Sequence, residues 1–181
     1  MAYDEQELLK RLSDPKTRRN AFGQLVAQYK ETLYWKVRRI VLDHEDANDV
    51  LQNVFLKAWQ NMNDFQQKSK ISTWLYRIAI NEALDFLRKR KPIYSVDGDE
   101  GQAVTKQLMA DEYFDGDETE AQLQAAIAQL PDVQRTVFTL RYYDEMKYSE
   151  MSQLLSTSEG SLKASYHIAV KKITEFFNKR D

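Results

Sequence analysis

The stretch YSEMSQLLSTSEGSLKASYHIAVKKI, from Tyr148 to Ile173, carries the clearest fold signal in this chain. Apolar residues such as Met151 and Leu155 mark a short helix, and a turn of small polar residues follows, in which Ser158 is suited to cap a second helix. A helix, a tight polar turn and a second amphipathic helix are the parts of a helix-turn-helix, which presents its second helix to the major groove of DNA. The other interpretation of the same pattern is two amphipathic helices packed in a bundle.

The second helix of this stretch has two distinct faces. At about 100° per residue, one face is apolar and is expected in the core, with Leu162, Tyr166, Ala169 and Ile173. The exposed face is the candidate DNA-reading surface, with Lys163, Ala164, His167, Ile168 and Lys171. Arginine is the usual bidentate reader of guanine, and this face has none, so few charged base contacts are expected. Ala164 and Ile168 suit contact with a thymine methyl group.

A second polar stripe is expected earlier in the chain, on a helix from Ser72 to Lys91. Its members recur at i, i+4, i+8 and i+11: Arg77, Asn81, Asp85 and Arg88. Arginine suits phosphates and asparagine suits a base edge. The loop before this helix holds Phe65 with Lys68 and Lys70, and an aromatic side chain beside basic ones suits an unstacked single-stranded base. Phe65 folded back onto the core is an equally good interpretation.

Charge and composition divide the chain into three parts. Residues 1–91 carry 17 Lys and Arg against 12 Asp and Glu, residues 92–132 carry 1 against 10, and residues 133–181 carry 8 against 6. Helical periodicity fills the first and last parts, and no stretch alternates as a strand does. We therefore expect an all-α protein with a helical domain over residues 1–91, a flexible acidic linker over 92–117 and a second helical domain over 118–181.

Composition also excludes several classes of function. Without cysteine the chain holds no disulfide framework, thiolate metal site or cysteine nucleophile. The N-terminus lacks the apolar core of a signal peptide, and no stretch approaches the ~18 apolar residues of a membrane span. His44 and His167 lie in different parts of the chain and form no acid–base or metal cluster. We expect a cytoplasmic protein that is not an enzyme and holds no cofactor or metal.

The first domain resembles region 2 of the extracytoplasmic-function (ECF) sigma factors of bacterial RNA polymerase. DANDVLQNVFLKAW, from Asp46 to Trp59, is similar to the family run Asp-Ala-x-Asp-x-x-Gln-x-Val-Phe-x-x-Ala-Trp. TWLYRIAIN, from Thr73 to Asn81, is similar to the Thr-Trp-Leu-x-Arg-Ile-Ala-x-Asn run that follows it, and a basic cluster comes next.

The last domain resembles region 4 of the same sigma factors. LPDVQRTVF, which begins at Leu130, is similar to the family pattern Leu-Pro-x-x-x-Arg-x-Val-Phe, and GSLK, which begins at Gly160, is similar to the start of its DNA-reading helix. Both modules occur in the family's order, and together they cover about residues 20–91 and 118–178. The resemblance therefore extends over most of the chain.

The resemblance implies three sets of contact residues. Binding of the melted −10 promoter element is expected at Phe65, Lys68, Arg77, Asn81 and Arg88. Binding of the upstream −35 element is expected at Lys163, Ala164, His167, Ile168 and Lys171. Binding of core RNA polymerase is expected at Asp49, Gln52, Asn53 and Phe55.

The expected function follows from these sets. The chain is expected to bind core RNA polymerase, to direct it to promoter DNA and to open that DNA with binding energy alone. An anti-sigma factor is a further partner expected for a protein of this type. Two other interpretations stay open: a DNA-binding regulator that acts without polymerase, and a helical protein-interaction module in which neither polar stripe meets nucleic acid.

Overall fold

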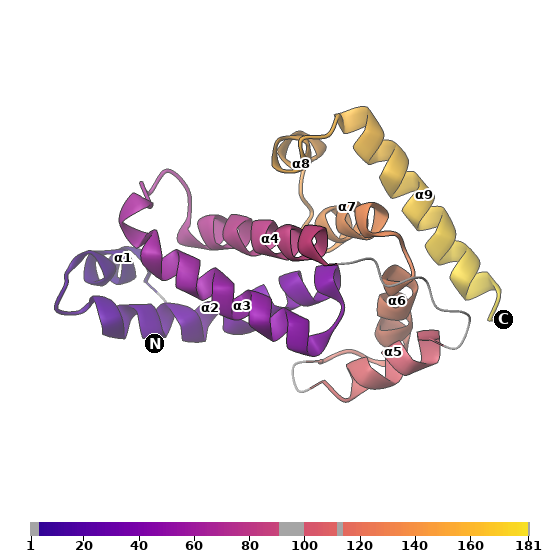
Figure 1. Cartoon of the computed structure of the whole chain (residues 1–181), viewed down its shortest axis with the longest axis horizontal. Helices are drawn as coiled ribbons and strands as arrows, with labels where there is room; N and C mark the ends of the chain where they lie inside the picture. Colours follow the sequence, from indigo (N-terminus) through magenta and orange to yellow (C-terminus); the bar gives the residue numbers. More distant parts are fainter. Residues whose placement is uncertain (1–3, 91–99, 112–113, 181) are drawn as a thin grey trace. The chain divides into compact units, whose positions relative to one another are not determined.

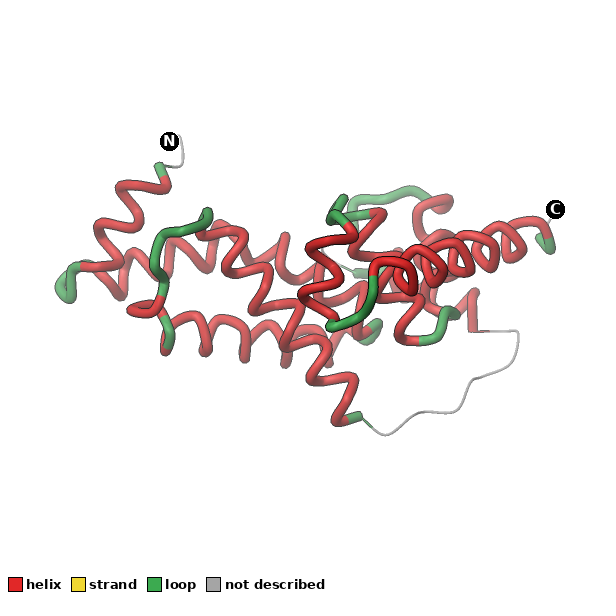
Figure 2. Tube along the Cα trace, turned by 90° about the horizontal axis from the view of Figure 1, so that it is seen from above, coloured by secondary structure: helices red, strands yellow, loops and turns green. Residues whose placement is uncertain are grey.

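The computed structural model of the chain describes residues 4–90, 100–111 and 114–180. Within these ranges the protein is built from helices and contains no strand. The chain divides into two compact units, Met1–Lys91 and Pro92–Asp181. Figure 1 follows the helices along the chain, and Figure 2 shows that short loops join most of them. The predicted all-α fold with two helical units is confirmed.

Unit 1 is a helical bundle. Its elements are α1 (Glu5–Ser13), α2 (Arg18–Val41), α3 (His44–Gln60), the 3-10 turn η1 (Met62–Asp64) and α4 (Ile71–Lys89). Helices α2, α3 and α4 pack against one another, and α1 lies against α2. The centre of the bundle is closed by fully buried apolar side chains, among them Leu25, Leu33, Val37, Val54, Ile71 and Leu75.

Short acidic side chains fix where two helices of unit 1 begin. The Asp4 carboxylate accepts hydrogen bonds from two backbone N–H groups in the first turn of α1, at 3.0 and 3.2 Å, and Asp43 accepts one at 3.0 Å in α3. Such caps satisfy donors that the first helical turn leaves unpaired, and each is typically worth about 1 kcal/mol. Leu42 ends α2 with a φ of 74°, and α3 starts two residues later.

Unit 2 surrounds a second apolar core. Its elements are α5 (Glu100–Met109), α6 (Glu118–Ala128), α7 (Asp132–Tyr142), α8 (Tyr148–Leu155) and α9 (Glu159–Asn178). Helix α9 contacts α6, α7 and α8. The buried cluster that joins α6, α7 and α9 consists of Ala126, Ile127, Leu130, Phe138, Ala169 and Ile173. The long helix α9 is therefore the element on which the rest of this core is assembled.

The structure differs from the prediction inside the predicted linker, residues 92–117. Residues 100–109 form α5, which packs against α6, and the side chain of Leu108 is only 3% exposed. The acidic composition and the glycines of this stretch hid a short helix with few apolar residues. Lys91 and residues 92–99 lie outside the described residues. The predicted flexibility and the predicted domain boundaries stay predictions.

Candidate nucleic-acid interface

Helices α8 and α9 form the predicted helix-turn-helix. The turn is short: Ser156 ends α8 in the left-handed region, with a φ of 51°, and α9 begins at Glu159. The Ser158 hydroxyl oxygen accepts a hydrogen bond from the Ser161 backbone N–H at 3.2 Å, so the predicted cap is confirmed. Figure 1 shows α8 nearly end-on while α9 runs lengthwise, so the two helices cross steeply.

The faces of α9 lie as the periodicity predicts. Leu162, Ala169 and Ile173 are buried, and Tyr166 is partly buried against the same core. The five residues predicted to contact the −35 element are all exposed: Lys163, Ala164, His167, Ile168 and Lys171. Ile168 is 43% exposed, which leaves its apolar side chain open to contact. The structure thus brings the predicted −35 set together on one surface.

A cationic cluster that the sequence did not reveal lies beside this surface. The Tyr148 ring has the Arg141 guanidinium carbon 4.9 Å from its centre and the Lys163 ammonium nitrogen 5.6 Å from it. Arg141 also donates a hydrogen bond to the Met146 carbonyl oxygen at 3.0 Å. The three side chains come from the end of α7 and the starts of α8 and α9. Two cations held by one ring suit the phosphates that flank a helix in the major groove.

Aromatic rings of α7 stack with Tyr166 of α9. The Phe138 ring stacks on Tyr142 at 5.1 Å and on Tyr166 at 5.6 Å, with interplanar angles of 15° and 12°. Burial, followed by the neighbouring Tyr148, raises the pKa of the Tyr166 hydroxyl above its usual value. A tyrosine hydroxyl with an ordinary pKa is already neutral near pH 7 and the raised pKa keeps it so, which means that the column adds no charge beside α9.

Arg135, the arginine of the Leu-Pro-x-x-x-Arg pattern, is a structural residue. Its side chain is 4% exposed, and it donates hydrogen bonds to the Leu130 carbonyl oxygen at 2.9 Å and to the Asp132 carboxylate at 2.6 Å. Leu130 lies in the turn between α6 and α7, and Asp132 is the first residue of α7. The buried guanidinium thus holds this turn closed and is not available to DNA.

The second predicted stripe lies on α4. Arg77, Asn81 and Arg88 are exposed, and the opposite side of the helix is buried at Leu75, Ala79 and Ala83 and partly buried at Ile78 and Phe86. Arg88 donates a hydrogen bond to the Asp85 carboxylate at 2.8 Å, on the same stripe. Arg77 and Asn81 therefore remain the two members best suited to a nucleic-acid strand.

The sequence left two positions open for Phe65, in the loop before α4: exposed to an unstacked base, or folded back onto the core. Phe65 is partly buried, and its ring centre lies 5.2 Å from that of Trp74, with the planes tilted by 42°. In the same loop Lys68 is exposed, and Gln67 lies in the left-handed region with a φ of 56°. The structure therefore supports neither a fully exposed Phe65 nor one fully packed into the core.

The residues predicted to bind polymerase lie on two different sides of α3. Asp49, Gln52 and Asn53 are exposed on one face, whereas Phe55 is partly buried and lies roughly a third of a turn away from them. Leu56, 54% exposed, lies among the three polar residues instead. The sequence pattern hid this residue, because an isolated leucine in an amphipathic helix suggests core.

An ion pair fixes α3 against α4. Lys57 on α3 pairs with Glu82 on α4. The hydrogen bond to Glu82 raises the pKa of the Lys57 ammonium group above its usual value. The face that carries Asp49 and the stripe that carries Asn81 therefore lie on two helices that pack against each other.

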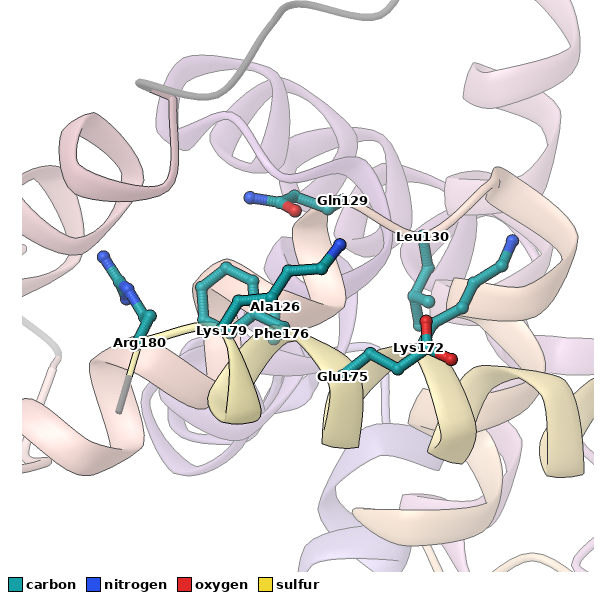
Figure 3. Close-up of a pocket in the computed structure, with 8 residues that line it drawn as sticks. All are labelled: Ala126, Gln129, Leu130, Lys172, Glu175, Phe176, Lys179 and Arg180. Carbon is teal, nitrogen blue, oxygen red and sulfur yellow. The ribbon is translucent and has the colours of Figure 1, made fainter.

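Unit 2 also contains a cavity of about 470 Å³ between α6 and the second half of α9. Figure 3 shows Leu130 and Phe176 at this cavity, with Lys172, Lys179 and Arg180 and the carboxylate of Glu175 around it. None of the residues predicted to contact DNA lines the cavity.

Neither histidine joins a metal-like cluster in the described ranges, where no group of three His, Asp or Glu side chains is placed as metal ligands are. His44 lies 2.7 Å from the Tyr34 hydroxyl and 3.1 Å from the Asn48 amide nitrogen, and it is thus held within unit 1. Over the same ranges, every helix is too short or too polar to cross a membrane.

Comparison with known families matches both units. Residues 25–93 match Sigma-70 region 2, and residues 120–173 match Sigma-70, region 4. The ECF RNA polymerase sigma factor SigW of Bacillus subtilis is 36% identical over 157 residues, which cover 82% of this chain and 84% of that protein. The RNA polymerase sigma-H factor of Pseudomonas aeruginosa is 32% identical over 88% of this chain and 86% of its own length.

Two solved structures share the fold. CnrH, determined in complex with the cytosolic domain of CnrY, aligns with a TM-score of 0.63 at 21% identity over 98% of this chain and 99% of its own. The sigma factor RpoE of Bartonella quintana, determined with the anti-sigma factor NepR, aligns with a TM-score of 0.65 at 20% identity over 87% and 96%. Since both region matches lie on the helical units described above and SigW is 36% identical over most of both chains, the protein belongs to the extracytoplasmic-function family of RNA polymerase sigma factors.

Proposed function

We propose that this sigma factor binds core RNA polymerase through α3 of unit 1, holds the opened −10 element on α4 and reads the −35 element with α9. The observation that carries the proposal is the pair of exposed polar faces, one on each unit, within the segments that match sigma regions 2 and 4. The protein acts by binding and does not itself catalyse a reaction.

The −10 site consists of Phe65, Lys68, Arg77, Asn81 and Arg88. Arg77 neutralises phosphate, the Asn81 amide reads a base edge, and Phe65 offers a ring for one unstacked base. Arg88 contributes least, because Asp85 already accepts a hydrogen bond from it and offsets its charge. Single-stranded DNA is the form that this arrangement suits, since stacking on Phe65 requires a base that has left the duplex.

The proposed −35 site consists of Lys163, Ala164, His167, Ile168 and Lys171. We add Arg141 and Tyr148 to it, because the Tyr148 ring lies beside both Arg141 and Lys163. Lys163 and Arg141 bind phosphates, and Ala164, His167 and Ile168 face the bases. This small number of charged contacts is enough if polymerase delivers the protein to DNA. Linking two weakly binding modules raises the effective concentration of each at its own promoter element.

The proposed polymerase site consists of Asp49, Gln52 and Asn53. We add Leu56 to it, because its side chain is exposed among these three residues. An exposed leucine surrounded by polar groups matches the apolar centre and polar rim of a protein–protein interface. Phe55, partly buried to one side, supports α3 from within the bundle and contacts polymerase less than the other three predicted residues.

An anti-sigma protein is the further partner that we propose. CnrH and RpoE, which share this fold, were each determined with a protein partner, and NepR is an anti-sigma factor. An inhibitor of this kind would act by covering the DNA and polymerase faces of units 1 and 2.

The test is reconstitution with core RNA polymerase. Purified protein is mixed with core enzyme, the complex is isolated by size exclusion, and transcription is measured from a library of promoter sequences. We expect a complex whose transcription depends on both promoter elements, whereas the free chain binds duplex promoter weakly at physiological salt. Tight sequence-specific binding without polymerase would indicate the stand-alone regulator, and no binding to either DNA or polymerase would indicate the protein-interaction module.

A further inference from the structure

Helix α1 contacts the start of α4, although the two are far apart in the chain. The Glu5 carboxylate accepts a hydrogen bond from the Ile71 backbone N–H at 2.9 Å, across 66 residues. Lys70, at the N-cap position of α4, makes no side-chain cap. Glu5 thus supplies from another helix the acceptor that α4 lacks locally, and its negative charge lies at the favourable end of the α4 dipole. Figure 1 shows α1 at the end of unit 1 where α4 begins.

A second polar contact holds the other end of the same loop. Arg18, the first residue of α2, donates hydrogen bonds to the Asn63 side-chain oxygen at 3.0 Å and to the Trp59 carbonyl oxygen at 3.3 Å. Its guanidinium carbon also lies 5.0 Å from the centre of the Trp59 ring. Residues 64–70, which include Phe65 and Lys68, therefore run between two anchor points, one held by Arg18 and the other by Glu5.

Packing behind this loop is incomplete. A cavity of about 180 Å³ lies between α1 and the loop, lined by Leu9 and Ser13 on one side and by Asn63, Phe65 and Gln67 on the other. Phe65 packs on Trp74, but this space leaves part of the loop without close contact to α1, so the polar anchors at its ends help to set its position.

We infer that Glu5 is a positioning residue for recognition of the −10 element. By fixing the first turn of α4, it sets where the loop with Phe65 lies relative to Arg77 and Asn81. The inference rests on the proposed function of α4. It gives α1 a role in promoter selection, although α1 lies before residue 25, where the match to sigma region 2 begins.

The experiment uses polymerase assembled with the full chain and measures open-promoter formation on a library of −10 sequences. Glu5→Ala removes the acceptor, and Glu5→Asp keeps the charge but withdraws it by one methylene. Glu5→Gln keeps an acceptor oxygen at the same reach. Glu7→Ala is the matched control, since Glu7 is exposed on the same helix.

We expect Glu5→Ala to slow opening on the preferred sequence by roughly 2- to 30-fold, the range that loss of a helix cap spans. The ratio of rates among −10 variants should change for Glu5→Ala and for Glu5→Asp, return toward wild type for Glu5→Gln and stay unchanged for Glu7→Ala. If Glu5→Ala fails to fold, the comparison of the Asp and Gln variants decides.

An unchanged order of −10 preference in the Asp and Ala variants, with losses that only follow their melting temperatures, overturns the inference. Glu5 would then be a stability residue alone. Failure of the proposed function has a different signature, because the wild-type protein itself would show no dependence on the −10 sequence in the assembled complex.

Discussion

The Lys163 ammonium nitrogen lies 5.6 Å from the centre of the Tyr148 ring, which joins the second turn of α9 to the start of α8. The Arg141 guanidinium carbon lies 4.9 Å from the centre of the same ring. A lysine held in this way loses less conformational freedom when it binds a phosphate than a freely rotating one. The proposed −35 surface thus has few cations, but one of them, Lys163, is held by a ring before DNA binds.

Lys163→Ala should therefore weaken binding to all −35 sequences by a similar factor. A phosphate contact carries no base information, so affinity falls uniformly and the slope of log affinity against log salt decreases by about 1. Binding of the assembled polymerase complex to a set of −35 variants, at several salt concentrations, measures both effects. Lys179→Ala, directly after the far end of the same helix, serves as the control. A change in base preference with an unchanged salt slope would assign Lys163 to base reading.

His167→Ala should do the opposite. His167 lies one turn after Lys163 on the exposed face, beside Ala164 and Ile168. Loss of a base contact relaxes choice at one position, and a good contact is worth ~1–3 kcal/mol of discrimination. Transcription from a −35 library with wild-type and variant protein shows the effect. If every position keeps its preference, α9 lies in the groove in a different rotation.

Asn81→Ala and Arg77→Ala should impair promoter opening more than assembly with polymerase. Both side chains are exposed on α4, away from the buried side at Leu75, so folding should survive. Permanganate reactivity of thymines reports opening, and size exclusion with core enzyme reports assembly. The double change Asp49→Ala and Gln52→Ala should instead weaken assembly. Equal loss of assembly in both groups, with native melting curves, would contradict the division between α3 and α4.

Much of the fold could be predicted because its helices carry strong local signals. The apolar stripe of α9 and the Ser158 cap placed the helix-turn-helix. The 3-10 turn η1 and helix α5 were missed, because three residues and a sparse apolar pattern give weak periodicity.

The contacts that complete the candidate sites were beyond prediction for a different reason. Glu5 meets Ile71 across 66 residues, and Arg141, Tyr148 and Lys163 come together from three helices. Periodicity shows which face a residue occupies, but it does not show which other helix lies against that face. Such contacts depend on tertiary packing.

Arg135→Met should destabilise unit 2 by about 1–3 kcal/mol. The methionine fills a similar volume, but the Leu130 carbonyl loses its buried donor, and an unsatisfied buried polar group carries a cost of this size. Thermal unfolding of the chain measures the change. Asp132→Asn is the control, because it removes the charge of the 63% exposed partner but leaves an oxygen that can accept the hydrogen bond from Arg135, so a smaller loss is expected. Equal losses in the two variants would show that the ion pair, and not the bond to Leu130, holds the turn.

Ser156→Gly should stabilise the helix-turn-helix by about 0.5–1 kcal/mol. Ser156 ends α8 with φ 51° and ψ 42°, in the left-handed region where a side chain is strained and glycine is not. Amide hydrogen exchange of α8 measures the gain locally, and thermal unfolding measures it globally. The matched control is Ser152→Gly, the same substitution inside α8, which should cost about 0.5–1 kcal/mol because an interior glycine loses more backbone entropy. If Ser156→Gly speeds exchange as Ser152→Gly does, the left-handed turn is not a source of strain, and the hydroxyl of Ser156 stabilises the turn instead.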